Sequence, residues 1–158
     1  MKNTFKRSGA ALISLVLLLV LAVSAGAASS QNVGVKFWKE RSDKESMANS
    51  GIDSNRTATL TRQANGTYTL TLPVMQVSKL GVTGYLSGLT IGDVTYDGTL
   101  TGDFNKTTAV LTIKNLPASV LTGSDVKKSV LVTCNIQMDL QVLGEINTSA
   151  RMCIWNQK

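Results

Sequence analysis

Residues 56–72, RTATLTRQANGTYTLTL, contain the strongest indication of the fold. Two alternating runs flank Asn65-Gly66, and in the second run Tyr68, Leu70 and Leu72 fall on one face of a strand because side chains alternate along it. Asn-Gly is the strongest short-range hairpin signal, since both residues tolerate positive φ. The stretch therefore predicts a β-hairpin.

Short strands and turns continue along the rest of the chain. Pro73 should end its strand because proline cannot donate to a ladder. Turns are predicted at Asp97-Gly98, at Asn105-Lys106 and near residues 143–145. The predicted strands are 56–61, 67–72, 91–96, 99–104, 108–113, 128–138 and 146–155. Seven or eight antiparallel strands in one domain predict an all-β sandwich.

The first 27 residues have the features of a secretory signal peptide. Three basic residues precede an apolar run over 10–23, which ends in Ala25-Gly26-Ala27. We predict a signal helix over 1–27, cleaved after Ala27 or the next residue, and one domain over 28–158. The alternative is an uncleaved anchor, because the apolar stretch is just long enough to span a membrane. Both place the domain outside the cytoplasm, secreted or at the cell surface, and cleavage leaves no membrane span.

Composition argues against nucleic-acid binding and catalysis. The predicted signal carries three of the 16 basic residues and none of the 10 acidic ones, so the net charge falls from +6 to 13 minus 10, or +3. The sequence has no sustained basic face with exposed aromatics, so we predict no nucleic-acid partner. It also has no histidine, the commonest general acid–base and transition-metal ligand. Neither a Ser-His pair nor a Cys/His zinc site can be built, so we predict that this is not an enzyme.

The two cysteines lie on the two arms of the last predicted hairpin. In an oxidising compartment, Cys134 and Cys153 could form a disulfide across neighbouring strands. Their direct pairing would also place Ile136 opposite Arg151, which conflicts with the alternation of apolar residues unless a bulge intervenes. A disulfide and two buried free thiols both stay open.

Four stretches, WKE (38–40), KESMAN (44–49), NGTYTLTL (65–72) and LGVTGYL (80–86), resemble the near-iron transporter (NEAT) domains of Gram-positive surface proteins. The resemblance extends over 33–155 and is closest to small clostridial-type secreted members. It implies an immunoglobulin-like sandwich and a role in iron acquisition. Haem-binding members hold haem between a short 3₁₀ turn and the last hairpin.

By this resemblance, Ser46 and Met47 fall in the 3₁₀ turn, where the family places a serine that bonds a haem propionate and a methionine over the ring. The residues alone allow two interpretations. A polarisable thioether suits a flat apolar ligand, but Met47 could also simply plug one end of the sandwich.

The last hairpin departs from the family pattern. Haem-binding members carry a Y-x-x-x-Y motif at the start of the final strand, and its first tyrosine ligates iron. Residues 138–149 contain no tyrosine and no histidine. Met138 or a cysteine thiolate could ligate iron in principle, but neither matches the family position. The sequence therefore leaves the metal ligand unknown.

The tip of this hairpin is unusually apolar and needs a cover. Its residues are Met138, Leu140, Val142, Leu143 and Ile146. The cover could be haem or another porphyrin, a host or cell-surface protein, a second copy, or the Met47 turn itself. We predict a secreted binding module that holds haem or a metal-free tetrapyrrole between Ser46-Met47 and the tip. The alternative is a structural or adhesive module that binds a protein partner through the tip.

Overall fold

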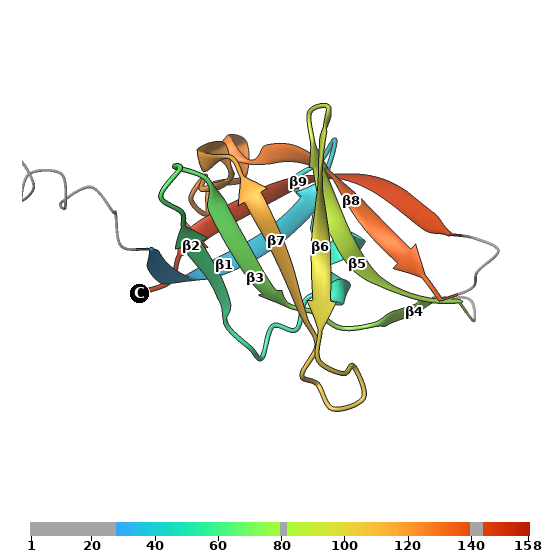
Figure 1. Ribbon diagram of the computed structural model, residues 1–158. Coiled ribbons are helices and arrows are strands. Elements are labelled where there is room, and N and C mark those ends of the chain that lie inside the picture. The colour runs from blue at the N-terminus through green and yellow to red at the C-terminus, as the bar shows by residue number, and fades with distance from the viewer. Residues whose placement is uncertain (1–27, 80–81, 140–143) are drawn as a thin grey trace, which may run out of the picture.

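The computed structural model describes residues 28–79, 82–139 and 144–158 (Figure 1). The predicted signal peptide and the tip residues Leu140, Val142 and Leu143 lie outside the described residues. In the described ranges, no helix is long and apolar enough to cross a membrane.

Nine strands and three short 3₁₀ helices make up the described chain. The strands are β1 (Ser29–Lys39), β2 (Ala58–Arg62), β3 (Tyr68–Pro73), β4 (Val77–Lys79), β5 (Val82–Ile91), β6 (Val94–Thr101), β7 (Val110–Leu116), β8 (Val130–Met138) and β9 (Glu145–Asn156). The helices are η1 (Met47–Gly51), η2 (Ala118–Val120) and η3 (Val126–Lys128).

Eight of the strands form a closed ring. Their order is β5-β6-β7-β3-β2-β1-β9-β8, and β8 pairs back onto β5. All these pairs are antiparallel, and the three-residue β4 adds to the outside of the ring along β5. In Figure 1, β2, β3, β7 and β6 form the front layer, with β1 and β9 behind them. The predicted all-β sandwich is confirmed, and its two layers belong to one continuous sheet.

The hairpin predicted at Asn65-Gly66 is confirmed. Strands β2 and β3 pair up to Arg62 opposite Tyr68, and Gly66 has a φ of +83°. Leu70 and Leu72 point into the core, where both are fully buried. Burying each such side chain contributes about 2 kcal/mol, so the alternation fixes which face of the hairpin turns inward.

The hairpin predicted at Asp97-Gly98 is wrong. Strand β6 runs straight through these residues, and the chain turns earlier, at Gly92-Asp93, where Gly92 has a φ of +58°. A glycine is needed at position 98 because Leu111 and the Ser87 backbone pack closely against it. A Cβ atom there would lie 2.4 Å from Leu111 Cδ1 and 2.7 Å from the Ser87 carbonyl oxygen. A glycine inside a strand often marks such a close approach.

Both cysteines are buried free thiols, so the cross-strand disulfide is not formed. Cys134 faces the core and lies opposite Thr148 in the register. Cys153 follows the core residue Met152, so it faces the other side of the sheet, with its Sγ 3.6 Å from the Asp125 carbonyl oxygen. The two sulfur atoms therefore lie on opposite faces of the sheet.

Replacing Gly98 with valine should destabilise the ring at the β5–β6–β7 contact. Overpacking of this kind costs about 1–3 kcal/mol. Urea unfolding measures the loss, and the neighbouring exposed change Asp97→Ala serves as the control, with an expected effect within about 0.5 kcal/mol. Equal stability of the Gly98→Val variant and the wild type would contradict the packing role.

Stability should fall at alkaline pH because of Cys134. Burial raises the pKa of the Cys134 thiol from 9.0 to about 12. The unfolded chain therefore ionises first, so the contribution of the neutral thiol is fully present below about pH 9 and is lost as the pH rises toward 12. Between about pH 7.5 and about pH 10, the wild type should lose about 1.4 kcal/mol more than Cys134→Ala in urea unfolding. Equal losses would contradict this assignment.

Candidate functional site

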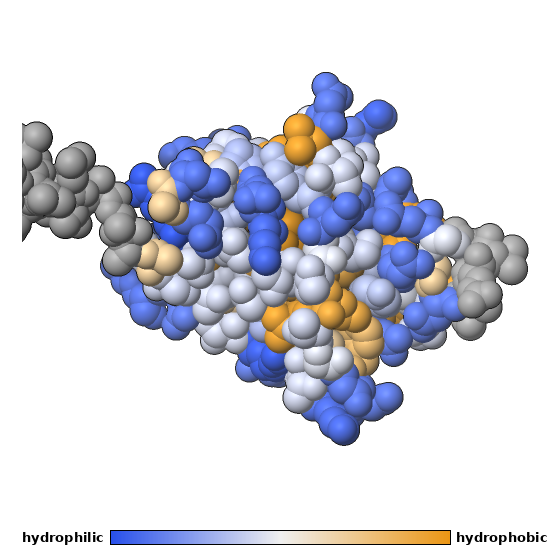
Figure 2. Space-filling view, in the orientation of Figure 1, coloured by the Kyte–Doolittle hydropathy of each residue, from blue (hydrophilic) through white to orange (hydrophobic). Residues whose placement is uncertain are grey.

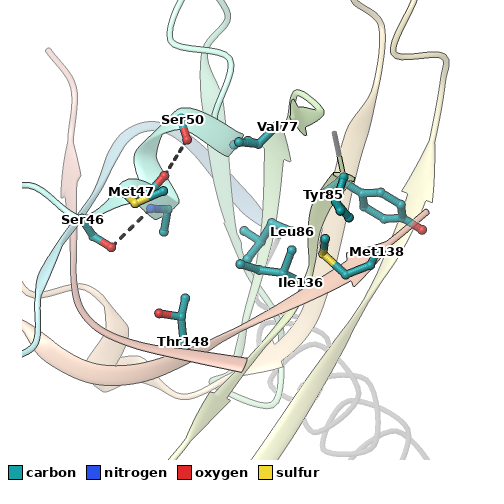
Figure 3. A pocket seen from close by; sticks show the side chains of 13 residues that line it. Ser46, Met47, Ser50, Val77, Tyr85, Leu86, Ile136, Met138 and Thr148 are labelled. Atoms are coloured by element: carbon teal, nitrogen blue, oxygen red, sulfur yellow. Dashed lines mark hydrogen bonds between the residues drawn. The ribbon is translucent and has the colours of Figure 1, made fainter. Parts of the chain in front are cut away.

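A pocket of about 240 Å³ opens between η1 and the paired strands β5 and β8 (Figure 3). Most of its lining is apolar, and none of the described residues that line it is charged. The serine and threonine side chains on its wall are Ser46, Ser50 and Thr148. The other lining residues are Met47, Ala48, Gly51, Val77, Val82, Gly84, Tyr85, Leu86, Ile136 and Met138.

The η1 wall is held in place by its own side chains. Ser46 caps the helix by accepting a hydrogen bond from the Ala48 N–H at 3.3 Å, and Ser50 Oγ donates to the Met47 carbonyl at 2.6 Å. Asn49 accepts from the Phe37 N–H and donates to the Phe37 carbonyl, both at 2.8 Å. Phe37 is fully buried, so Asn49 fastens η1 to the core.

Met47 and Met138 lie on opposite walls of the pocket. Met47 projects from η1 and is 60% exposed, which places it at the mouth. Figure 3 shows Met138 on the far side of Leu86 and Ile136, which are paired across β5 and β8 and line the space between. The pocket therefore presents one thioether on each side of an aliphatic floor.

Gly84 makes room for the second thioether. It lies opposite Met138 in the register, and a Cβ atom at this position would be 2.8 Å from Met138 Sδ and 2.9 Å from the Gln137 carbonyl oxygen. Any side chain here would collide with Met138 and with the Gln137 backbone. The sequence analysis did not single out Gly84, although a glycine inside a strand often marks such a close approach.

No phenol oxygen is directed at the centre of the pocket from the described residues. Tyr85 contributes to the wall, but its ring packs on Phe104 with centroids 5.3 Å apart, and Figure 3 shows its hydroxyl pointing away from the cavity. Tyr68 and Tyr96 pack against the hydrophobic core. Across the described ranges, no group of three or more Cys, Asp or Glu side chains could hold a metal ion.

The structure brings together Ser46, Met47 and Met138 of the predicted site. Ile146 pairs with Ile136 in the register but is 44% exposed and does not line the pocket. The three remaining predicted residues are the undescribed tip residues. The prediction missed most of the β5 wall and Thr148, because β5 and β8 become neighbours only when the ring closes.

Comparisons with known proteins support the architecture. No family model matches the sequence, and no curated protein is similar to it. A solved structure of a mutant of the IsdX2 NEAT5 domain in complex with haem matches with a TM-score of 0.53 and 10% sequence identity, covering 83% of this chain and 98% of that domain. The chain has the NEAT fold. The predicted resemblance is thus confirmed at the level of the fold, which is what a likeness at this identity shows.

A second solved structure, the NEAT5 domain of IsdX2, a B. anthracis hemophore in complex with haem, matches over the same shares of both chains. Its TM-score is 0.49 and its identity 9%.

Removing the Asn49 side chain should loosen η1 and destabilise the domain. Asn49→Ala leaves the N–H and carbonyl of Phe37 without these partners, at a cost of about 2 kcal/mol. Urea unfolding checks this value. Asn32→Ala is a matched control, because Asn32 is an exposed asparagine on β1, the strand that carries Phe37. It should change stability by less than about 0.5 kcal/mol. Similar stabilities of the two variants would rule out the anchoring role.

Proposed function

We propose that this chain is an exported, non-catalytic binding module that holds a tetrapyrrole ring in the pocket between η1 and the β5–β8 wall. One observation carries the proposal: Met47 and Met138 line opposite sides of an aliphatic floor, in a pocket whose described lining residues carry no charge. The pocket lies beside a 3₁₀ helix and the last strand pair, where the resemblance to NEAT domains implies a haem site.

The lining suits the ring better than it suits the iron. Methionine side chains are polarisable and adapt to flat aromatic surfaces. The Ser46 and Thr148 hydroxyls offer hydrogen bonds to polar groups at the edge of the ring. For the iron atom of haem, the pocket offers the thioethers of Met47 and Met138, which are soft donors, in place of the family's tyrosine. Iron is therefore not required for binding in this proposal.

Apolar burial alone can support such binding at moderate strength. Removing roughly 250 Å² of ring surface from water contributes about 6 kcal/mol. A gain of this size corresponds to a dissociation constant of about 40 μM, and association entropy opposes it, so we expect dissociation constants of about 40 μM or weaker. A module of this affinity would take up and release its ligand without chemistry. The predicted signal peptide agrees with such a role outside the cytoplasm, in iron acquisition.

The alternative function is attachment to a protein partner through the apolar tip of the last hairpin. It has one structural observation in its favour. Met47 and Ile146 are large apolar residues with exposed fractions of 60% and 44%, so a partner that covered them would bury apolar surface. A host or cell-surface protein that covered them would compete with a tetrapyrrole for the mouth of the pocket.

Titration of residues 28–158 with haemin and with metal-free protoporphyrin tests the proposal. Both ligands should give saturable absorbance changes at one equivalent. The double variant Met47→Ala, Met138→Ala should bind both about tenfold more weakly, because each lost thioether–ring contact contributes about 0.7 kcal/mol.

Met75→Ala is the matched control for this titration, because Met75 is 41% exposed and does not line the pocket. Its binding should equal that of the wild type. Saturable binding of haemin alone would mean that the iron is essential, contrary to the proposal. Binding of neither ligand would overturn it and favour the protein-partner alternative.

A further inference from the structure

The outer face of β2, β3, β7 and β6 is built mainly from threonine. Along these strands the residues between the threonines, such as Leu60, Leu70 and Leu111, are fully buried in the core, so the threonines face outward. We call this surface the threonine face. Its members are Thr59, Thr61, Thr69, Thr71, Thr99, Thr101 and Thr112.

Four of these threonines form a row across four neighbouring strands. Thr59 lies opposite Thr71 and Thr71 opposite Thr112, which in turn lies opposite Thr99. Neighbouring strands are about 4.8 Å apart, so the row extends over about 14 Å. The threonine face therefore carries hydroxyl groups at regular intervals across the sheet.

A polar groove of about 630 Å³ continues the threonine face at one end. Thr61 and Thr69 belong to both, and Gln63 Nε2 donates to Thr69 Oγ1 at 3.1 Å. Asn65 and Asn115 add further side-chain amides to its lining, and Lys114 is the one charged residue there. Hydroxyl and amide groups both donate and accept hydrogen bonds, as sugar hydroxyls do.

Charge is excluded from the row itself. The outward-facing charged residues of β6 and β7 are Asp97 and Lys114, which lie two residues further along from Thr99 and Thr112. In Figure 2 much of the front of the molecule is pale, the colour of residues of intermediate hydropathy, with blue residues within it as well as around its edges. The row thus differs from an ordinary soluble surface, in which charges of both signs are interspersed.

Strand propensity explains part of this pattern. Threonine favours strands, and opposed threonines stabilise a sheet. Propensity accounts neither for the lack of charge along the row nor for the groove of amides that extends it. An anionic ligand would need a cluster of cations, and a protein partner would need aromatic or arginine anchors. The row presents neither.

From this chemistry, we propose that the threonine face and its groove bind an uncharged, extended polysaccharide. Successive sugar hydroxyls would hydrogen-bond to the threonine row and to the amides of Gln63, Asn65 and Asn115. Each contact is weak, so retention depends on many of them along one polymer. This site is separate from the tetrapyrrole pocket, whose lining shares no residue with it.

Co-sedimentation of the purified protein with insoluble cellulose and with chitin tests the proposal. The wild type should be depleted from solution by at least one of them. Thr71→Val, Thr112→Val keeps the shape and strand propensity of the row but removes its central hydroxyls, and should lower the apparent affinity by roughly tenfold. Thr83→Val, Thr133→Val on β5 and β8 makes the same chemical change outside the threonine face and should leave retention unchanged.

Three results would overturn the proposal. They are no retention on either polysaccharide, equal retention of wild type and the Thr71/Thr112 variant, and an equal loss in both double variants. Retention only on a charged polysaccharide such as heparin would also overturn it, because it would assign the interaction to the lysines. Circular dichroism of both variants checks that each is folded, and haemin titration of the Thr71/Thr112 variant checks that the pocket is unaffected.

Discussion

The pairing of β5 with β8 is the constraint on which the rest of the structure depends. It joins the two ends of an eight-strand sheet and removes the free edges that an open sheet would expose. It also brings Leu86 beside Ile136 and Gly84 beside Met138, which together make one wall of the pocket. The closure of the ring and one wall of the candidate site therefore depend on the same strand pairing.

Alternation and turn chemistry predicted much of the sheet. The Asn65-Gly66 hairpin, the end of β3 at Pro73 and the inward face of β8 all follow from local rules. Strand β1 was not predicted, although it is one of the longest. Its pattern is obscured because Gly34 is buried under the Trp155 ring, which a Cβ atom at Gly34 would approach to 2.3 Å. The turn prediction at Asp97-Gly98 was wrong for the same reason, because Gly98 is required by the close approach of Leu111 and not by a turn.

The candidate site was predictable only in part. Ser46 and Met47 stand in a recognisable local stretch, and Met138 follows from the alternation of the last hairpin. The contribution of β5 and Thr148 to the pocket depends on which strands pair when the ring closes. No local sequence pattern contains that information. The absence of tyrosine from the last hairpin was visible in the sequence. That absence separates the haem chemistry of the family from the fold that this chain shares with it.

The placement of the two thiols on opposite faces of one sheet means that a disulfide through either of them can report past unfolding. In the native state neither sulfur can reach the other, and both are buried from other molecules. In the proposed exported role the chain would pass through oxidising surroundings, where accessible thiols form disulfides. A disulfide through Cys134 or Cys153 would therefore mark a molecule that had unfolded, wholly or locally, at some point after its synthesis.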